Sequence, residues 1–245
     1  METLDFTGRN VLVVGGSSGI GNGIAQAFRA RGAAVTVWGT RKSAQDYATS
    51  EGSDLTGLAY EQVDVSDERS IEAAAGFTEL DVLVLCQGVV RYERAEFKMP
   101  GFREVLEVNL MSLMACADKF HDALTAAKGA LIIVSSIAAF RSTMGNPAYN
   151  ASKTGAYGLT RTLAEAWARD GIRVNGIAPG LVDTKLTKAT TDNPKRLSAS
   201  LRKIPLGRLG MPADMAGVAL FLASDLSAYV LGQTIIVDGG LILGG

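Results

Sequence analysis

Short apolar runs alternate along the chain with longer amphipathic stretches. The apolar runs have the length of β-strands and lie at 10–14, 34–38, 58–63, 82–86, 130–135, 173–178 and 234–237. The amphipathic stretches predict helices at 20–31, 43–51, 67–76, 101–127, 148–169 and 212–222. The runs are apolar continuously rather than at every second position, which indicates burial on both faces, and strand–helix alternation requires parallel crossovers. The pattern therefore predicts an α/β fold: a single doubly wound parallel sheet of about seven strands with helices on both faces.

A single domain covering residues 1–245 is expected, because no linker, internal repeat or low-complexity segment divides the chain. One stretch, 180–210, lacks clear periodicity and is too long for an ordinary connection between elements. Loops of that length inside a domain are usually functional, so this stretch is predicted to be a substrate-binding loop.

The charge and hydropathy of the chain indicate whether nucleic acid or a membrane is an expected partner. The chain has 24 Lys and Arg against 25 Asp and Glu, a formal net charge of −1, and the two signs are interspersed. Without a basic block, nucleic acid is not an expected partner. The first ten residues lack a basic region followed by an apolar one, and no apolar run reaches the ~18 residues needed to span a bilayer. We therefore expect a cytoplasmic protein that does not enter membranes.

Metal and disulfide chemistry are both disfavoured. Cys86 and Cys116 are the only cysteines, and His121 is the only histidine. Two cysteines cannot build a disulfide framework, and no cluster has the spacing of metal ligands. We therefore expect no metal site, and the single histidine also argues against a Ser-His-Asp triad.

A tyrosine and a lysine one helical turn apart are the main candidates for chemistry. Tyr149 and Lys153 would share a helix face, and Ser136 lies thirteen residues before Tyr149. A tyrosine hydroxyl, with a pKa of about 10, is a poor proton shuttle at neutral pH, and a neighbouring ammonium group would lower that pKa. The pair predicts proton transfer by Tyr149, although the spacing alone is weak evidence and depends on its context.

A glycine-rich segment supplies that context. The sequence VVGGSSGIG follows the first predicted strand and opens the first predicted helix, with Gly15, Gly19 and Gly21 in GxxxGxG spacing. Glycines there permit a tight turn, let backbone amides approach a pyrophosphate and let the helix direct its positive end at the phosphates. The alternative is a strand-to-helix turn without a ligand. The position between a strand and a helix favours dinucleotide binding.

Further motifs follow this turn in order: Asp64-Val65, Gly88, Asn109, Ser136, YNASK at 149–153, NGIAPGLVDT at 175–184 and VDGG at 237–240. On these motifs the chain resembles the short-chain dehydrogenase/reductase family over nearly its whole length. The Gly-Thr pair at 39–40 is similar to that of the ketoacyl-carrier-protein reductases within it. The resemblance implies a Rossmann fold and NAD(P)-dependent interconversion of a secondary alcohol and a ketone by hydride transfer.

The same resemblance implies roles for individual residues. Tyr149 would be the acid/base, Lys153 would tune it and hold the cofactor ribose, and Ser136 would polarise the substrate oxygen. Asn109 would hold a proton-relay water. The implied cofactor-binding set is Gly15, Ser17, Ser18, Gly19, Ile20, Gly21, Thr40, Arg41, Asp64, Val65, Gly88, Tyr149, Lys153, Pro179, Gly180, Val182 and Thr184.

The chain departs from the family pattern at two places. Val14 stands where the family usually has threonine, and Leu85, Cys86, Gln87 and Gly88 replace an Asn-Asn-Ala-Gly segment. Neither departure touches the chemical step. Gln87 would nevertheless have to replace contacts that shorter amides usually make.

The end of the second strand predicts the cofactor preference. An acidic residue there would bind the adenosine ribose and repel a phosphate on it. The chain has Gly39, Thr40 and Arg41 instead. NADP(H) is therefore favoured, with NAD(H) as the alternative.

The expected substrate is a small ketone or secondary alcohol. A largely apolar pocket is suggested by Val89, Phe140, Met144, Leu181 and Leu186. A 3-ketoacyl thioester of a carrier protein or coenzyme A is an alternative within the same chemistry, and a non-catalytic nucleotide-binding redox sensor is an alternative of another class. The family resemblance also implies a homotetramer. The apolar segment 106–117 and the apolar tail 239–245 agree with this expectation, because such surfaces need cover.

Overall fold

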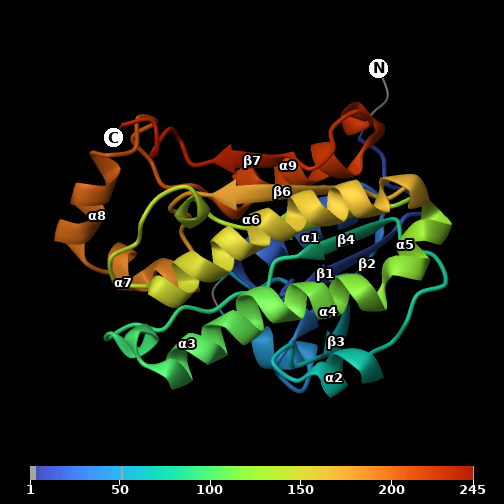
Figure 1. Cartoon of the computed structure of the whole chain (residues 1–245), viewed down its shortest axis with the longest axis horizontal. Helices are drawn as coiled ribbons and strands as arrows, with labels where there is room; N and C mark the ends of the chain where they lie inside the picture. Colours follow the sequence, from blue (N-terminus) through green and yellow to red (C-terminus); the bar gives the residue numbers. More distant parts are fainter. Residues whose placement is uncertain (1–3, 51, 245) are drawn as a thin grey trace.

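The computed structural model describes residues 4–50 and 52–244. Within them, seven strands form one parallel sheet in the order β3-β2-β1-β4-β5-β6-β7 (Figure 1). The strands are β1 (Asn10–Val14), β2 (Ala34–Gly39), β3 (Ala59–Gln62), β4 (Val82–Leu85), β5 (Ala130–Val134), β6 (Arg173–Pro179) and β7 (Thr234–Val237). The predicted doubly wound parallel sheet is confirmed, and every strand boundary lies within one residue of its prediction.

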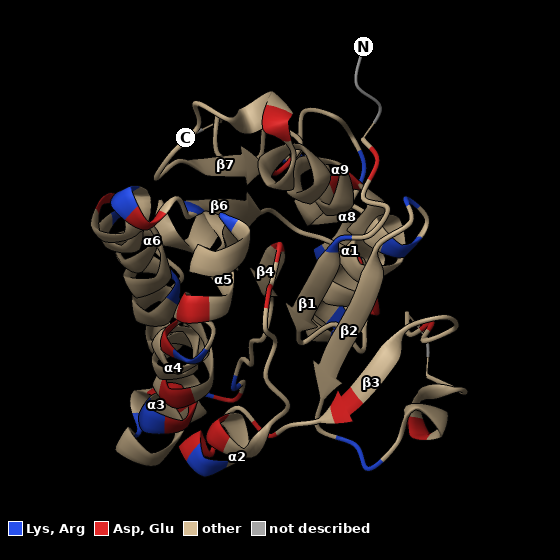
Figure 2. Cartoon of the chain, turned by 90° about the vertical axis from the view of Figure 1, so that its right-hand side faces the viewer, with Lys and Arg blue, Asp and Glu red and all other residues tan. Residues whose placement is uncertain are grey.

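Helices cover both faces of this sheet. The α-helices are α1 (Gly19–Arg29), α2 (Glu68–Ala73), α3 (Met99–Leu106), α4 (Ser112–Lys119), α5 (His121–Ala127), α6 (Pro147–Trp167), α7 (Lys188–Thr191), α8 (Pro194–Leu201) and α9 (Pro212–Ala223). Figures 1 and 2 show α3 to α6 on one side of the strands and α1 with α9 on the other. Charged residues of both signs lie along the outer helices, whereas the central strands carry few (Figure 2).

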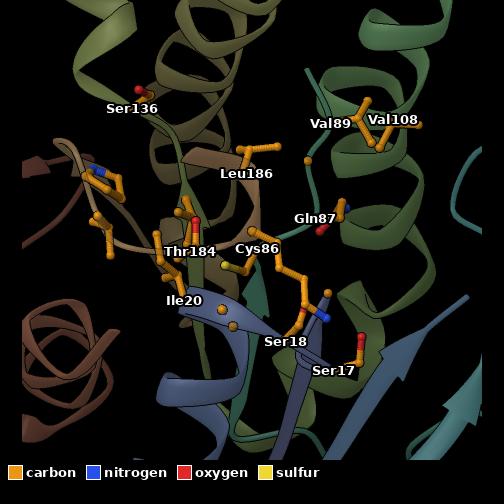
Figure 3. Close-up of a pocket in the computed structure, with 18 of the residues that line it drawn as sticks. Ser17, Ser18, Ile20, Cys86, Gln87, Val89, Val108, Ser136, Thr184 and Leu186 are labelled. Carbon is orange, nitrogen blue, oxygen red and sulfur yellow. The ribbon is translucent and has the colours of Figure 1, made fainter. Parts of the chain in front are cut away.

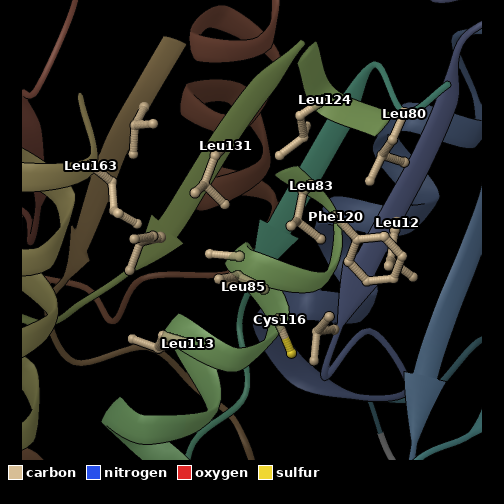
Figure 4. Packing of buried hydrophobic residues seen from close by; sticks show 14 of the residues in the cluster. Leu12, Leu80, Leu83, Leu85, Leu113, Cys116, Phe120, Leu124, Leu131 and Leu163 are labelled. Atoms are coloured by element: carbon tan, nitrogen blue, oxygen red, sulfur yellow. The ribbon is translucent and has the colours of Figure 1, made fainter. Parts of the chain in front are cut away.

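The hydrophobic core consists of two clusters, one on each face of the sheet, because successive side chains along a strand point to opposite faces. In β1, Leu12 belongs to the cluster beneath α4 to α6, whereas Val11 and Val13 belong to the cluster beneath α1 and α9. Figure 4 shows the first cluster, in which Leu113 and Phe120 from the helical layer face leucines of the strands. Because both faces are covered, both strand positions are apolar, which explains the continuous apolar runs.

Two predicted helices differ in the structure. The helix expected at 43–51 is only a single 3₁₀ turn, Ala44–Tyr47, and its expected end at Glu51 lies outside the described residues. The Asp46 carboxylate accepts hydrogen bonds from the Ser43 backbone N–H (2.9 Å) and hydroxyl (3.1 Å), which closes this turn on itself. Further along, the helix expected at 101–127 is divided into α3, a π-helical turn Glu107–Met111, α4 and α5.

The stretch 180–210 is more ordered than its lack of periodicity indicated. It contains a 3₁₀ turn, α7 and α8, and its ends are joined by a bridge between Val182 and Gly210. The Gly210 N–H donates to the Leu181 carbonyl at 2.9 Å, and the Asp183 N–H donates to the Gly210 carbonyl at 3.0 Å. The stretch is therefore a long loop whose two ends are held together by hydrogen bonds.

Within the described ranges, no helix is long and apolar enough to cross a membrane. The last residue of the apolar tail, Gly245, lies outside those ranges.

Candidate active site

A cavity of about 370 Å³ lies at the carboxyl ends of the strands. This is where open α/β sheets bind ligands, at the crevice where neighbouring strands connect in opposite directions, here β1 and β4. Figure 3 shows Ser136 at one end of the cavity and Ser17 and Ser18 at the other. The predicted residues that line it are Gly15, Ser17, Ser18, Gly19, Ile20, Gly21, Thr40, Val65, Gly88, Ser136, Tyr149, Lys153, Pro179, Gly180, Val182 and Thr184.

The glycine-rich turn is held by close approach of backbone. Gly15 and Gly19 have positive φ angles of 74° and 56°, which favour glycine. A Cβ on Gly21 would lie 2.3 Å from the Gly15 carbonyl oxygen, and a Cβ on Gly15 would lie 2.9 Å from the backbone of Gln87. Larger residues would therefore push α1 away from β1 and β4.

The first turn of α1 is built to receive an anion. Its N-cap residue, Ser18, makes no side-chain capping hydrogen bond, and no acidic residue lies in the first turn. The first backbone N–H groups of a helix lack intrahelical partners, and the helix dipole adds positive potential there. The Gly19 N–H donates to the Gly52 carbonyl at 2.8 Å, and the next residues of this turn, Ile20 and Gly21, line the cavity, where their N–H groups would suit the pyrophosphate of a dinucleotide.

Gln87 carries a buried acceptor without a partner. The side chain is 5% exposed and lines the cavity, and its Nε2 donates to Ser112 Oγ at 2.9 Å. Its Oε1 is buried and has no hydrogen-bond partner in the described part of the chain. An orphaned acceptor in a cavity wall is costly unless a ligand or water donates to it, which fits a ligand with hydroxyl or amino groups.

Three polar side chains converge at the opposite end of the cavity. Ser136 follows β5, and Tyr149 and Lys153 lie one turn apart at the start of α6. The Ser136 hydroxyl lies close enough to Tyr149 to lower the pKa of the tyrosine. Lys153 is 4% exposed, and its Nζ donates to the Val134 carbonyl at 2.9 Å and lies 5.7 Å from the centre of the Tyr149 ring. The sequence-predicted trio is thus brought together.

Burial determines how these groups titrate. It raises the pKa of Tyr149, against which the hydrogen bond with Ser136 acts, while Tyr92 and Glu96 raise that pKa further. Burial also lowers the pKa of Lys153 to about 8. The expected lowering of the Tyr149 pKa by Lys153 is not seen here, because desolvation disfavours the charged form of both groups.

Asn109 does not line the cavity, although it lies directly behind it. Its Oδ1 accepts from the Val89 N–H at 2.7 Å, and its Nδ2 donates to the Val89 carbonyl at 2.9 Å and to Ser152 Oγ at 3.2 Å. The residue is fully buried and sits in the π-helical turn. The π-helical turn is one of the places where the predicted helix is interrupted. Such turns often occur at functional sites.

Arg41 also lies outside the cavity wall. Its guanidinium stacks 4.4 Å from the centre of the Tyr47 ring and donates to Ser50 Oγ (2.8 Å) and to the Asp46 carbonyl. The expectation that Arg41 faces the cofactor is not met in this structure, because these local partners turn it onto the 46–50 segment. Thr40 lines the cavity as expected.

Asp64 differs from its prediction for a similar reason. Its carboxylate accepts from the Ser66 N–H at 3.0 Å and from the Ser66 hydroxyl at 2.7 Å, which turns it away from the cavity. Its neighbours Val63 and Val65 line the wall instead.

Of the residues expected in the apolar pocket, Val89 and Leu186 line the cavity, whereas Phe140, Met144 and Leu181 do not. The other lining residues lie at strand ends, near the base of the 180–210 stretch or, for Val108, in the π-helical turn, and they are Trp38, Gly39, Val63, Cys86, Gln87, Val108, Val134, Ser135, Lys185 and Thr187. The sequence singled out Gly39 and Gln87 among them, and for most of the others the only signal was a place at the carboxyl end of a predicted strand. Burial raises the pKa of the Cys86 thiol to about 12, so Cys86 lines the wall as a neutral group. Among the described residues, no group of His, Cys, Asp or Glu could hold a metal ion.

Comparison with known proteins agrees with this architecture. A family model described as enoyl-(acyl carrier protein) reductase matches residues 14–242. The 3-oxoacyl-[acyl-carrier-protein] reductase FabG of Chlamydia muridarum is 37% identical over 239 residues, which are 94% of this chain and 96% of that protein. The 2-dehydro-3-deoxy-D-gluconate 5-dehydrogenase of Bacillus subtilis is 36% identical over 250 residues, 98% of this chain and 96% of that protein.

Solved structures give the same result. The crystal structure of a gluconate 5-dehydrogenase from Burkholderia cenocepacia J2315, in complex with NADP and tartrate, has a TM-score of 0.89 and 28% sequence identity, and the match covers 99% of this chain and 98% of that one. The family model and these relatives match almost the full length of the chain, and most of the predicted motif residues line the cavity. The chain belongs to the short-chain dehydrogenase/reductase family and is an NAD(P)-dependent oxidoreductase acting on CH–OH groups.

Proposed function

We propose that this protein reduces a small ketone to a secondary alcohol with NADPH as the hydride donor. The observation that carries the proposal is the cavity itself, which joins the glycine-rich turn and uncapped start of α1 to the trio of Ser136, Tyr149 and Lys153. One part of the cavity suits a pyrophosphate, and the other suits a carbonyl oxygen that gains a proton.

Each member of the trio has a distinct task in this proposal. When bound, the nicotinamide supplies the hydride. Tyr149 donates its phenolic proton to the substrate oxygen, and the Ser136 hydroxyl donates a hydrogen bond to the same oxygen as negative charge develops. Lys153 uses one of its three N–H groups on the Val134 carbonyl, which leaves two for the ribose hydroxyls.

In the free protein, Tyr149 has the protonation state that carbonyl reduction requires. Its pKa is raised by burial, so at neutral pH the free protein presents a phenol rather than a phenolate. A phenol is the form that protonates a developing alkoxide. The oxidative direction would need a bound cationic nicotinamide to stabilise the phenolate.

Asn109 is proposed to hold a relay water that returns the proton to Tyr149 through Lys153. A Cβ on Gly88 would lie 3.6 Å from both Asn109 Oδ1 and Lys153 Nζ, so the two atoms flank the same point. Asn109 Oδ1 accepts one hydrogen bond from Val89 and has a second lone pair for a water.

The absence of an acid at Gly39 supports NADP(H), with NAD(H) as the alternative. A Cβ on Gly39 would lie 2.7 Å from both Ser17 Oγ and Tyr47 Oη, so this position lies among hydroxyl groups. We expect Gly39→Asp to weaken NADPH binding at least about tenfold more than NADH binding, because like charges repel. Gly39→Ala, which adds the Cβ without the charge, is the control and should affect both cofactors equally. If Gly39→Asp weakened NADPH and NADH binding equally, NAD(H) would become the favoured cofactor.

A small ketone fits the substrate end of the cavity. Val89 and Leu186 line it, and the 180–210 stretch is proposed to be the substrate-binding loop. The Tyr92 hydroxyl donates to the Leu186 carbonyl at 2.8 Å, which joins this loop to the segment after β4.

A 3-ketoacyl thioester on an acidic carrier protein is the second candidate, and one observation favours it. The loop region 185–203 contains six Lys or Arg residues and a single acid, Asp192. Lys185 is exposed and lines the cavity mouth. Such a surface would attract a carrier protein, a phosphorylated arm or a substrate with a carboxylate.

A substrate panel tests these proposals. NADPH and NADH absorbance is followed with simple ketones, keto sugar acids, and 3-ketoacyl groups on coenzyme A and on carrier protein. The proposal predicts turnover with at least one ketone and a preference for NADPH. Cofactor binding without turnover on any carbonyl compound would favour the redox-sensor alternative.

A further inference from the structure

Glu96 is a buried carboxylate in the wall behind the proposed active site. It is fully buried on the 3₁₀ turn Ala95–Phe97. Its Oε1 accepts from the Arg91 backbone N–H at 2.9 Å and from Asn146 Nδ2 at 3.2 Å. Its Oε2 accepts from the Tyr149 backbone N–H at 2.9 Å. All three partners donate, so the acceptor-only carboxylate is the form that matches this site.

The third of these hydrogen bonds reaches the proposed acid/base residue. Tyr149 lies in the first turn of α6, where backbone N–H groups have no intrahelical partner. The N-cap residue of α6, Asn146, makes no side-chain capping bond. Glu96 therefore caps this helix from a segment 53 residues earlier in the chain.

The backbone before Glu96 is held in an unfavourable conformation. Glu93 and Arg94 have φ angles of 55° and 60°, in the left-handed region that side chains of L-residues disfavour. Strain of this kind persists only where surrounding contacts fix the chain. The hydrogen bonds of Glu96 are contacts of that kind, and they set how the 88–98 loop approaches α6.

We propose that Glu96 is a positioning residue that fixes the backbone of Tyr149 against the 88–98 loop, so that the phenol and the loop residue Val89 face the substrate in a set geometry. The inference rests on the proposed role of Tyr149 as acid/base. Proton transfer depends steeply on the distance and direction between donor and acceptor, so a small shift of the α6 first turn reduces turnover.

The charge of Glu96 gives the proposal a second, measurable consequence. The titratable groups that face the Tyr149 hydroxyl are Tyr92, Cys86 and Glu96, with Lys153 beside the ring. Tyr92, Cys86 and Glu96 all raise the pKa of Tyr149, and the contribution of Glu96 is the smallest of the three. Removing its charge should therefore lower that pKa, which a purely structural role in a distant part of the fold would not do.

Three variants separate geometry from charge. Glu96→Gln removes the charge and presents an amide N–H to one of the three donors. Glu96→Asp keeps the charge and withdraws the carboxylate by one methylene. Glu93→Gln removes the same charge from an exposed site three residues earlier and is the control.

We expect Glu96→Gln to lower kcat about tenfold or more, with the NADPH Kd within about twofold of wild type, and to move the apparent pKa of the kcat profile downward. Glu96→Asp should have an intermediate kcat with an apparent pKa near that of wild type. Glu93→Gln should change neither. A Glu96→Gln variant with wild-type kcat and an unmoved pKa, or with only a lower Tm, would overturn the proposal.

A spectroscopic titration measures the change in the Tyr149 pKa without requiring turnover. Tyrosinate absorbance, taken as the difference between proteins with and without Tyr149→Phe, gives the Tyr149 titration in the wild-type and Glu96→Gln backgrounds. If Glu96→Gln does not fold, two other variants replace it: Asn146→Ala, which removes one donor to Glu96, and Glu96→Asp. Both variants must then lower kcat, and wild-type kcat in both would overturn the proposal. Failure of the proposed function would appear separately, as a wild-type protein inactive on every carbonyl substrate or a Tyr149→Phe variant that remains active.

Discussion

Lys153 is a buried ammonium group whose hydrogen-bond partner is the carbonyl oxygen of Val134. Burial lowers its pKa to about 8, so the charge is present below that pH and is lost above it. A neutral lysine donates weaker hydrogen bonds than an ammonium group. The grip that we propose on the cofactor ribose should therefore depend on pH in a range close to neutral.

This dependence can be measured by fluorescence titration of NADPH. In the wild type, the NADPH Kd should rise as pH rises through about 8. Lys153→Met cannot titrate, so its Kd should be higher at neutral pH and should lack this step. Parallel curves for the two proteins would show that the Lys153 charge does not hold the cofactor.

The sequence predicted Ser136, Tyr149 and Lys153 through the family motifs to which they belong, and the structure brings these three residues to one cavity. It was not sufficient to place Arg41, whose direction is set by the Tyr47 ring and the Ser50 hydroxyl. Glu96 was missed entirely, since one buried carboxylate in a loop has no local signature. Its role appears only when the hydrogen bonds between distant segments are known.

At the scale of elements, the start of α1 and the π-helical turn position the site. The close approach of Gly21 to Gly15 places the α1 N-terminus at the cavity. The turn Glu107–Met111 brings the Asn109 side chain to Val89. Sequence periodicity predicted a continuous helix there, because no proline or glycine between 102 and 128 marks a break.

Two glycine substitutions test whether close approach, rather than helix propensity, requires glycine in α1. Gly21→Ala should lower the Tm by several degrees and raise the NADPH Kd, because its Cβ would overlap the Gly15 carbonyl. Gly217→Ala, on the exposed side of α9 with nothing within 4 Å, should instead stabilise by about 0.5–1 kcal/mol. Thermal unfolding with and without NADPH measures both. Similar Tm changes in the two variants would contradict this explanation of the turn.

At the scale of the whole molecule, the sheet was predictable because both of its faces are apolar and every strand is bounded by turns or helices. Among the described residues, exposed apolar side chains occur at several places, and two of these places bear on assembly. Met111 and Met114 are 56% and 40% exposed beside α4, and Leu243 is 84% exposed in the C-terminal tail beyond β7. In a closed dihedral assembly, each of these two places could be covered by a different symmetry copy.

We therefore expect a homotetramer, and light scattering at micromolar concentration tests it. The expected mass is about four times the 25.7 kDa of one chain. Met114→Glu should reduce this to a dimer by placing a charge in one interface, whereas Lys42→Glu, at an exposed residue near the end of β2, should not. A wild-type mass near 25.7 kDa would contradict the expectation.

The central claim is that Tyr149 transfers the proton during carbonyl reduction, and a single substitution tests it most directly. Tyr149→Phe keeps the ring in place and removes the hydroxyl that Ser136 contacts. With the best ketone from the panel, kcat should fall about 10²–10⁴-fold, the usual contribution of general acid catalysis, while the NADPH Kd and the Tm stay close to wild type. A Tyr149→Phe variant with near wild-type kcat would contradict the account.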